Sequence, residues 1–547
     1  MVDPRTSLVD VVTSPERRAA YEASGAWDAT TLAGAVARHA TERPTAVAVV
    51  DESGRYSYDR LASDAASLAD ALLERGLTPG SVASVQLPNR YEAAVAAVAI
   101  GSLGAVINPL LPNYRAHELE HVWRTASPAV VITPDVYRDF DHRSLVAEVA
   151  ATTGVRPHHI VVGRPGGEGA ESMTELLARG DGSFGSASAA AVSELIFTSG
   201  TEARPKAIMH TEQTANFSVR VARADLAVTD DDVVWMPSPV GHSTGFNYGL
   251  RFALYHGLPL VLQDRWDAAT AVGLVQREGA SYTLAATTFL QDLVEQATRQ
   301  GVRLDRLARF GCGGAPVPPR LVEAAEAVGI GVLRLYGSTE VLVGTWNRPW
   351  STGEQRRRTD GVAMSGVELE VRDADNRVVP PGTAGELVTR GPNTCVGFFA
   401  DPERTAAMFE PEGWVRSGDT VTIDADGYLT VVGRTKEILI RGGINIAPRE
   451  IEDLLGGFTE VERAAVIGLP DERLGERMCA CVVLRAGASL DLDTVVDRFR
   501  QRGVATYKWP QRLEVLDSLP ATASGKIQKH VIVSELLARE ARRGGNA

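Results

Sequence analysis

Residues 197–206 combine small, hydroxyl-bearing and basic side chains in an order that suits polyphosphate binding. They read Phe-Thr-Ser-Gly-Thr-Glu-Ala-Arg-Pro-Lys and lie between two short apolar runs, 195–197 and 207–209. Small residues let backbone N–H groups approach phosphate oxygens, and hydroxyl and ammonium groups add charge-assisted hydrogen bonds. The common P-loop instead ends in Gly-Lys-Ser/Thr and runs into a helix. The stretch predicts a strand–loop–strand phosphate site, although such clusters taken alone are usually plain turns.

Two later motifs carry groups suited to a nucleotide. Residues 309–317 form a strand that runs into a glycine-rich turn, which indicates close backbone approach to a flat ligand; in isolation an ordinary tight turn is favoured. Residues 336–340, Tyr-Gly-Ser-Thr-Glu, follow the apolar run 332–335. An aromatic ring, two hydroxyls and a carboxylate at the end of a strand fit base stacking, phosphate binding and Mg²⁺ ligation.

Three polar turns follow towards the C-terminus. Asp419 comes after a Ser-Gly turn and is suited to accept hydrogen bonds from ribose hydroxyls, with a turn-forming Asp equally favoured without context. The charged segment 433–437 predicts a domain boundary. The stretch 521–527, Ala-Thr-Ala-Ser-Gly-Lys-Ile, would in isolation be a solvated turn.

The elements that must position these motifs alternate between strand and helix. Apolar runs predict strands, and Ala- and Leu-rich stretches with helical spacing predict helices. The expected strands are 46–50, 56–58, 82–86, 106–108, 129–132, 233–239, 258–262 and 282–285, and the expected helices are 15–24, 31–41, 59–75 and 91–103. This alternation predicts a parallel sheet covered on both faces.

Two other regions have distinct patterns. Residues 163–190 are rich in Gly, Ser, Glu and Ala, which predicts a mobile surface segment leading into the phosphate stretch. Residues 438–446 predict a hairpin with glycines at its bend, and Pro448 then starts a helix.

Charge and composition exclude several classes of function. The chain has 547 residues with a formal net charge of -13, which argues against nonspecific nucleic-acid binding and against an anionic membrane surface. Residues 1–10 carry no apolar signal, and the apolar region 93–111 is broken by polar residues and glycines, so we expect a cytoplasmic protein without a membrane span. Four cysteines do not make a disulfide framework, and Cys479 and Cys481 should share one face of a strand in the core.

These motifs, in this order, resemble the adenylate-forming superfamily of acyl-CoA synthetases, adenylation domains and beetle luciferases. The likeness extends from about residue 32 to residue 529. The stretch 105–112 with Arg115 is most similar to the cyclohexanecarboxylate and medium-chain acyl-CoA ligase branch, and residues 17–27 also resemble aryl-acid adenylating enzymes.

The resemblance implies an α/β fold with two domains. The large N-terminal domain, 1–433, would contain stacked α/β sheets and a β-subdomain and would hold ATP and the acyl group. A hinge at 434–437 would connect it to a small, mobile α+β domain, 438–547, with the catalytic lysine and the CoA tunnel.

The resemblance also implies a two-step reaction. A carboxylate attacks the α-phosphate of ATP to form acyl-AMP and pyrophosphate, and the CoA thiolate then displaces AMP. Lys526 would bridge the carboxylate and the α-phosphate, since two anions must meet while negative charge builds up. Mg²⁺ would be ligated by Glu340 and Thr201.

The remaining roles follow motif by motif. The β- and γ-phosphates would be held by Thr198, Ser199, Gly200, Thr201 and Lys206. The adenine and α-phosphate would be contacted by Gly313, Gly314, Ala315, Pro316, Tyr336, Gly337, Ser338 and Thr339, and the ribose by Asp419 and Arg434. The hinge would be at Lys436, and the CoA tunnel would be lined by Arg441, Gly442 and Gly443. The acyl pocket would be gated by His242 and formed by Ser243, Gly245, Phe246, Gly249, Gly313 and Gly344.

Some of these residues have plainer interpretations. A lone histidine such as His242 is more often structural, and Lys436 would otherwise be a surface charge in a linker.

The phosphate stretch departs from the family pattern. Glu202 replaces a hydroxyl residue, and Ala203 and Ala207 replace glycines. Ala203 would be strained by of order 1 kcal/mol if it needs a positive φ. A carboxylate facing the triphosphate at ~4 Å would cost on the order of 1–4 kcal/mol. If both side chains instead point to solvent, the loop works normally, and we favour that interpretation.

The sequence predicts only the class of the carboxylic acid substrate. The amino-acid-activating branch carries an Asp near the position of 238–241, where this chain has Ser, Pro, Val and Gly, so an apolar acid fits better. Glycines at 241, 245, 249, 313 and 344 predict room for a ring or fused rings.

The leading hypothesis is an ATP-dependent carboxylic acid–CoA ligase acting on an apolar alicyclic or polycyclic acid. Three alternatives stay open: an enzyme that only converts a preformed acyl-adenylate to the thioester, an acyl-AMP ligase that loads a carrier protein, and a non-catalytic paralogue. The expected partners are the acid or acyl-adenylate and coenzyme A, with neither nucleic acid nor membrane; a homodimer is left open.

Overall fold

The computed structural model of the chain describes residues 13–163, 169–180, 182–198, 205–314, 317–373, 375–434, 439–446, 448–520, 527 and 529–544. The chain divides into two compact units. The first comprises Met1–Pro112, Val122–Phe197 and Lys206–Thr435, and the second Asn113–His121, Thr198–Pro205 and Lys436–Ala547.

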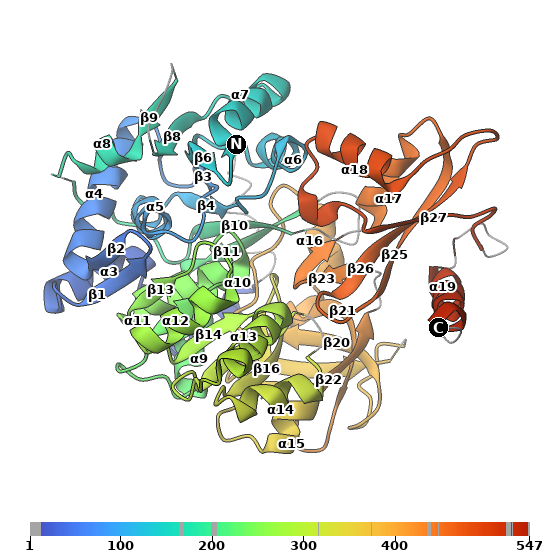
Figure 1. The fold of residues 1–547 in the computed structure, drawn as a ribbon. Helices are drawn as coiled ribbons and strands as arrows, with labels where there is room; N and C mark the ends of the chain where they lie inside the picture. The colour runs from blue at the N-terminus through green and yellow to red at the C-terminus, as the bar shows by residue number, and fades with distance from the viewer. Residues whose placement is uncertain are drawn as a thin grey trace. The chain divides into compact units, whose positions relative to one another are not determined.

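The first sheet of the first unit is parallel at its centre and antiparallel at its edges (Figure 1). In spatial order its strands are β18 (Val362–Ala363), β17 (Leu342–Trp346), β16 (Val332–Ser338), β15 (Arg309–Cys312), β14 (Tyr282–Ala285), β12 (Val234–Met236), β13 (Leu260–Leu262), β1 (Val47–Asp51) and β2 (Gly54–Ser57). Strands of such a parallel centre are buried on both faces, which explains their continuous apolar runs.

The second sheet pairs parallel strands from both sides of the predicted phosphate stretch. Its order is β11 (Lys206–Thr211), β10 (Val192–Thr198), β4 (Val106–Pro109), β3 (Val82–Val85), β5 (Val130–Pro134), β8 (His158–Val162) and β9 (Ala170–Ser172). The predicted strand–loop–strand arrangement is confirmed for its two strands, since Lys206 begins β11 and no helix follows it directly.

Helix α5 (Tyr91–Ser102) packs between these two sheets. It contacts β1 of the first sheet and β3 and β4 of the second, and residues 93–100 are all buried. A helix that is apolar all round belongs in a core, and its alanines let both sheets approach closely. The predicted parallel sheet with helical cover is therefore confirmed.

The other helices of the first unit begin at ordinary caps. Ser14, Thr31 and Ser57, for example, accept hydrogen bonds from the first turns of α2, α3 and α4. The helices are α2 (Pro15–Ala23), α3 (Leu32–Glu42), α4 (Tyr58–Glu74), α7 (His142–Thr153), α8 (Met173–Leu177), α9 (Glu212–Asp225), α10 (Ser243–Gly245), the π-helix η1 (Phe246–Arg251), α11 (Phe252–His256), α12 (Ala268–Glu278), α13 (Thr287–Gln300), α14 (Pro319–Ala327), α15 (Gly353–Arg358) and α16 (Pro402–Met408).

A third, antiparallel sheet forms the β-subdomain of the first unit. Its order is β19 (Glu368–Arg372), β20 (Gly385–Arg390), β21 (Val415–Ile423) and β22 (Leu429–Arg434). Its buried residues Val371, Leu387, Val421 and Leu429 pack in one cluster with Tyr336 of β16. The nucleotide motif on β16 therefore lies against this sheet.

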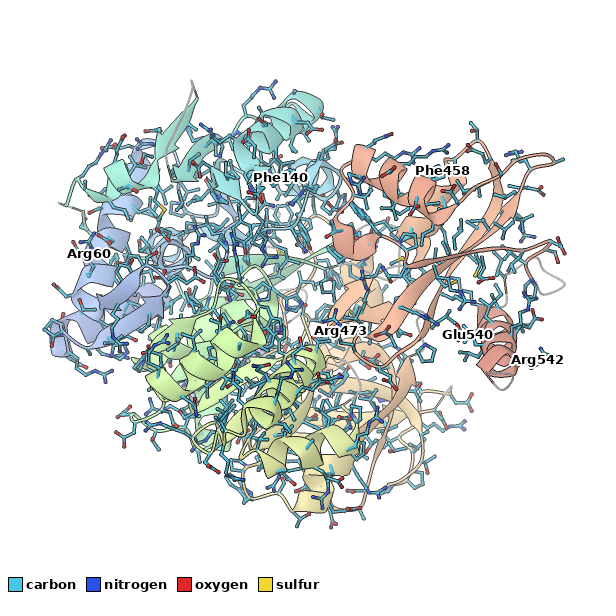
Figure 2. The ribbon with its side chains drawn as sticks, viewed as in Figure 1. Arg60, Phe140, Phe458, Arg473, Glu540 and Arg542 are labelled. Carbon is cyan, nitrogen blue, oxygen red and sulfur yellow. The ribbon has the colours of Figure 1, made fainter. Side chains whose placement is uncertain are left out.

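The second unit has its own sheet and core. The sheet order is β24 (Ile444–Ile446), β23 (Leu439–Arg441), β26 (Gly475–Leu484) and β25 (Val461–Asp471), with β27 (Arg512–Val515) parallel to β26. Helices α17 (Pro448–Gly456), α18 (Leu492–Gln501) and α19 (Lys529–Gly544) complete it. Glu540 of α19, labelled in Figure 2, pairs with Arg477, at 2.6 Å, and with Arg512, and these ion pairs tie the helix to β26 and β27.

Three details of the second unit confirm predictions. The β23–β24 hairpin turns at Gly442 and Gly443, both with positive φ, as a two-residue type I′ turn requires. Cys479 and Cys481 share one face of β26, with their sulfurs 3.8 Å apart in the core. Pro448 starts α17, as expected from its position.

The prediction of a mobile surface segment at 163–190 is wrong for residues 169–180. Strand β9 pairs with β8, and α8 buries Met173 and Leu176 in the main core. These two apolar residues are three apart and so lie on one face of a helical turn, which outweighs the polar composition around them.

Helix α6 (Ala116–Ala126) crosses the division between the two units.

In the described part of the chain, every helix is too short or too polar to cross a membrane.

Candidate active site

The predicted phosphate-binding lysine lies beside the predicted metal-binding carboxylate. Lys206 Nζ is 3.3 Å from Glu340 Oε1, and both side chains are largely buried, with 14% and 12% of their surfaces exposed. The ammonium group also lies 5.5 Å from the centre of the Phe398 ring. Residues 134 positions apart are thus brought together because β11 and the β16–β17 turn meet here.

Glu340 stays ionised in this environment. Burial raises the pKa of the carboxyl, but the charge of Lys206 and hydrogen bonds to the carboxylate outweigh burial, so its pKa lies below the ordinary value. An ionised carboxylate is a suitable ligand for Mg²⁺, because this ion binds one or two protein carboxylates together with phosphate oxygens. Thr201, the other expected ligand, lies outside the described residues.

Much of the predicted phosphate loop is also outside the described residues, namely Ser199, Gly200 and residues 201–204. Thr198 is the last residue of β10. Ala207, one of the two alanines that replace family glycines, is 5% exposed within regular β11, and it is not among the described residues with positive φ. An alanine is unstrained there, so this departure does not disturb the strand.

His210 belongs with this group and was missed by the sequence reasoning. Its Nε2 donates to the backbone carbonyl of Thr339 at 2.7 Å, and its Nδ1 lies 3.1 Å from Thr214 Oγ1. Burial lowers the pKa of the imidazole, which keeps it neutral. The spacing in the sequence could have revealed it: His210 comes four positions after Lys206 in a strand, so both side chains point to the same face of that strand. His210 therefore holds the Thr339–Glu340 turn beneath Lys206.

The predicted adenine and ribose contacts also meet. The Tyr336 hydroxyl donates to Asp419 Oδ2 at 2.8 Å, although the two residues are 83 positions apart. Asp419 in β21 lies opposite Arg434 in β22, whose backbone alone is described. The Ser417 hydroxyl accepts a hydrogen bond from the Asp419 N–H at 3.0 Å, which shapes the turn. An aromatic ring next to a fixed carboxylate suits a nucleoside.

Two glycines of these motifs allow close backbone contact. A Cβ on Gly313 would lie 2.4 Å from the carbonyl oxygen of Leu335, and one on Gly337 would lie 2.2 Å from that of Leu342. Gly314 follows with φ +79°, while Ala315 and Pro316 lie outside the described residues. Ser338 is the last residue of β16.

The predicted acyl-pocket residues lie on a short helical segment after β12. His242 caps α10, where its Nδ1 accepts from the Thr244 N–H at 3.3 Å, and burial lowers the pKa of its ring. Ser243 and Gly245 are in α10, and Phe246 and Gly249 are in the π-helix η1. Short π-helical turns are rare and often mark functional sites.

The expectation that glycines leave room for a ring here is wrong for four of the five positions. A Cβ on Gly245 would lie 2.2 Å from the carbonyl oxygen of Pro239, and one on Gly249 would lie 2.5 Å from Met236 Cγ. Gly241 and Gly313 meet backbone at 2.3 and 2.4 Å, and only Gly344 has ordinary spacing, 3.7 Å to Tyr336. The space is filled by protein, so these glycines serve close packing.

An apolar cavity of about 10 Å³ adjoins this segment. It is lined by Val85, Leu87, Ala93, Ile107, Pro109, Val240, Gly241, Phe246 and Leu250. That volume holds no more than about one water molecule, and its walls carry no charge.

In the second unit, the predicted CoA-tunnel residues form the β23–β24 hairpin. Arg441 Nη1 donates to the backbone carbonyl of Tyr507 at 2.8 Å, and burial lowers the pKa of its guanidinium. Gly442 and Gly443 form the bend. Lys436 and Lys526 lie outside the described residues.

Two protein-family models match the chain. A model described as AMP-binding enzyme matches residues 36–399, and one described as AMP-binding enzyme C-terminal domain matches residues 450–526.

The chain belongs to the AMP-binding enzyme family.

Two proteins with named activities are similar to this AMP-binding enzyme over nearly its whole length. It is 36% identical to a medium-chain fatty-acid–CoA ligase of Escherichia coli (strain K12), over 97% of this chain and 95% of the relative. It is 32% identical to a 3-[(3aS,4S,7aS)-7a-methyl-1,5-dioxo-octahydro-1H-inden-4-yl]propanoyl:CoA ligase of Rhodococcus jostii (strain RHA1), over 92% and 99%.

A solved structure agrees in fold. The amide bond synthetase McbA from Marinactinospora thermotolerans superposes with a TM-score of 0.83 at 27% identity, covering 92% of this chain and 99% of McbA. The expected adenylate-forming fold, with a large N-terminal domain and a C-terminal domain, is confirmed.

Proposed function

We propose that this AMP-binding enzyme is an ATP-dependent acid–CoA ligase that forms an acyl-adenylate and then an acyl-CoA. The observation that carries the proposal is the Lys206–Glu340 pair at 3.3 Å, because it places a phosphate-binding cation beside a carboxylate suited to Mg²⁺. The Tyr336–Asp419 pair supplies a nucleoside site in the same unit. The coenzyme A ligases among its relatives support the choice of thiol.

In the first step, the chain's own residues bind ATP and the acid. Lys206 pairs with β- and γ-phosphate oxygens, and Asp419 accepts hydrogen bonds from the ribose hydroxyls. Lys526 bridges the carboxylate and the α-phosphate, which stabilises the negative charge that builds up between them. Mg²⁺, when bound at Glu340, neutralises phosphate charge. His210 keeps the Thr339–Glu340 turn in place through its 2.7 Å hydrogen bond.

The second step uses the C-terminal part. We assign the domains as 1–433 and 438–547 with the hinge at 434–437. The two compact units of the fold divide between Thr435 and Lys436, which lies within this hinge. The β23–β24 hairpin, with its two glycines at the bend, lines the path of the pantetheine arm. The CoA thiolate attacks the acyl carbon, the acyl–phosphate bond breaks, and AMP leaves with its electron pair.

The acid is apolar and monocarboxylic. The cavity beside η1 has uncharged walls, and residues 238–241 carry no carboxylate to pair with a substrate amine. We choose an unbranched acyl chain over the alicyclic or polycyclic acid expected from the glycines, because four of those five glycines pack against protein. The medium-chain fatty-acid–CoA ligase among the relatives supports this choice.

All four cysteines are buried and free of disulfides, which fits the reducing cytoplasm.

A second candidate is an enzyme that performs the thioester step alone. Glu202 and Ala203 stand where the family has a hydroxyl residue and a glycine. If they face the triphosphate, they weaken contacts to the β- and γ-phosphates, which ATP has and acyl-AMP lacks.

The test is mass spectrometry of reactions with octanoate, cyclohexanecarboxylate or salicylate in the presence of ATP and CoA. Adenylate and thioester are measured separately, with and without CoA. We expect octanoyl-AMP without CoA and octanoyl-CoA with it. Thioester from supplied octanoyl-AMP without adenylation of octanoate would select the second candidate. Formation of neither product from any acid, by either route, would overturn both.

A further inference from the structure

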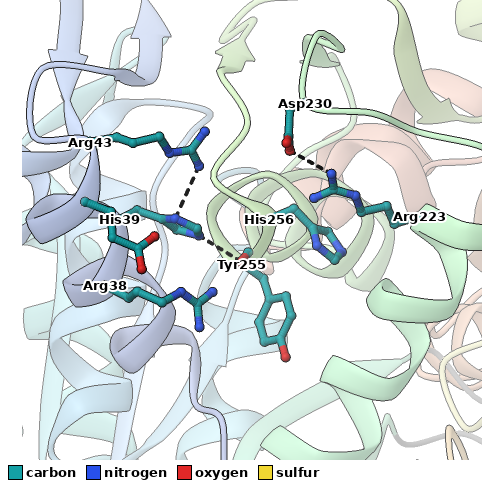
Figure 3. Close-up of a pocket in the computed structure, with 8 residues that line it drawn as sticks. Arg38, His39, Arg43, Arg223, Asp230, Tyr255 and His256 are labelled. Atoms are coloured by element: carbon teal, nitrogen blue, oxygen red, sulfur yellow. Dashed lines mark hydrogen bonds and ion pairs between the residues drawn. The ribbon is translucent and has the colours of Figure 1, made fainter.

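A cavity of about 420 Å³ in the first unit shares no residue with the candidate active site (Figure 3). Its lining is unusually rich in basic groups for a chain with a net charge of -13. The lining residues are Arg38, His39, Glu42, Arg43, Arg223, Asp230, Tyr255 and His256. Its volume is in the range of small-molecule sites.

Three helices supply these side chains. Arg38 and His39 lie on α3, and Arg43 follows its last residue. Arg223 lies in the last turn of α9, and His256 ends α11. Figure 3 shows the side chains converging from these elements on one opening.

Arg43 is held in a fixed position. Its Nη2 donates to the carbonyl oxygen of Gly257 at 3.1 Å and to His39 Nδ1 at 3.2 Å. His39 in turn donates from Nε2 to the Tyr255 carbonyl oxygen at 3.1 Å. A Cβ on Gly257 would lie only 1.8 Å from Arg43 Nη2, so the glycine makes room for the guanidinium. Preorganisation of this kind lowers the entropic cost of binding a ligand.

The remaining charges leave an excess of positive charge. Arg223 pairs with Asp230 at 2.7 Å, as Figure 3 shows. Within the described residues, the side chain of Arg38 is exposed and makes no hydrogen bond or ion pair. Three arginines face the carboxylates of Glu42 and Asp230. Burial lowers the pKa of His39, and that of His256 to about 4, so both rings are neutral at pH 7 and the positive charge comes from the arginines.

We propose that this cavity binds a small phosphate-bearing anion, with Arg38, Arg43 and Arg223 as donors. The planar fork of N–H groups on arginine matches the oxygens of a phosphate group. Two opposed carboxylates disfavour a ligand with many negative charges, which selects a single phosphate group over a polyphosphate.

The test is isothermal titration calorimetry of inorganic phosphate into the full chain at pH 7.5. Arg38→Ala should weaken phosphate binding about tenfold, because a charged hydrogen bond is lost. Arg320→Ala removes the same charge from an exposed position on α14, and Lys206→Ala removes the active-site cation; neither should change the dissociation constant of this site. Arg43→Lys tests the fixed guanidinium and should weaken binding as well.

Several results would overturn the proposal. These are no phosphate binding by the wild type, a loss in Lys206→Ala alone, or an equal loss in Arg38→Ala and Arg320→Ala. Citrate, which carries carboxylates only, is titrated in parallel, and binding as tight as that of phosphate would contradict the choice of a phosphate group. Circular dichroism and melting of each variant show whether it is folded, and a variant that is unfolded is replaced by the corresponding Gln substitution.

Discussion

Lys206 Nζ lies 3.3 Å from Glu340 Oε1, between the start of β11 and the turn that follows β16. The pair is largely shielded from water, which strengthens the attraction between the two charges. It also means that removal of either partner leaves a buried charge alone. The contact therefore links the stability of the first unit to the groups proposed to receive the phosphates of ATP.

Replacement of this lysine should reduce stability in a pH-dependent way. In the wild type, the pKa of Glu340 lies below 4.5, so its contribution to stability is present above pH 4.5 and is lost as the pH falls through the folded pKa. Lys206→Met leaves burial as the main influence, which raises that pKa. We expect a loss of about 1–3 kcal/mol at pH 7 that shrinks towards pH 4.

Calorimetric melting at pH 4, 5.5 and 7 measures this effect. The matched control is the double variant Lys206→Met with Glu340→Gln, which removes both charges and should recover most of the loss at pH 7. A deficit of the same size at all three pH values would argue against the pair as its cause.

The favoured interpretation, in which Glu202 and Ala203 point to solvent, predicts that the altered phosphate loop is neutral, whereas the second candidate predicts that these two residues slow adenylation. Under the second candidate, Glu202→Thr combined with Ala203→Gly should raise pyrophosphate release by about tenfold, since a like-charge contact of ~1–2 kcal/mol would be removed. Thioester formation from supplied acyl-AMP should change little. Ala207→Gly is the control: in regular β11 it should give no gain and cost roughly 0.5–1 kcal/mol of stability. Wild-type adenylation already at ~1–10³ s⁻¹ would show the loop departure to be neutral.

Lys526 should matter for the first half-reaction alone. Lys526→Ala is expected to lower adenylate formation by roughly 100-fold or more, because only that step joins two anions. Thioester formation from supplied acyl-AMP should remain near the wild-type rate. Lys529→Ala, three residues along, is the control; Lys529 pairs with Glu452 at 2.8 Å and should not affect adenylation. Pyrophosphate release at the wild-type rate in Lys526→Ala would remove this residue from the proposed role.

Stiffening of the hinge should affect the second half-reaction. A proline at position 436 restricts the backbone, so Lys436→Pro should leave acyl-AMP formation largely intact and slow its conversion to thioester. Single-turnover measurements of the two steps separate these effects. Lys436→Ala serves as the control for the lost charge. An equal loss of both half-reactions in Lys436→Pro would place the hinge elsewhere.

Local patterns in the sequence were enough to predict most elements of the first unit. The apolar runs at β3, β4 and β5 and the alanine-rich α5 follow directly from periodicity, since a strand or helix depends on neighbours a few positions away. The prediction failed at residues 169–180, because it rested on polar composition and ignored the helical spacing of Met173 and Leu176, which are buried in the core. The glycines after β12 also misled, because their sequence cannot show whether the space beside a glycine is open or filled by Met236.

The sequence alone determined the order of the motifs, and with it the family. Only the tertiary structure decided which groups meet. Tyr336 and Asp419, 83 positions apart, are joined by a 2.8 Å hydrogen bond, and His210 reaches the carbonyl oxygen of Thr339 across 129 positions. Such contacts depend on which strands pair and how a sheet twists against its neighbour. The free energy of that packing is summed over the whole core and is not encoded in any single stretch.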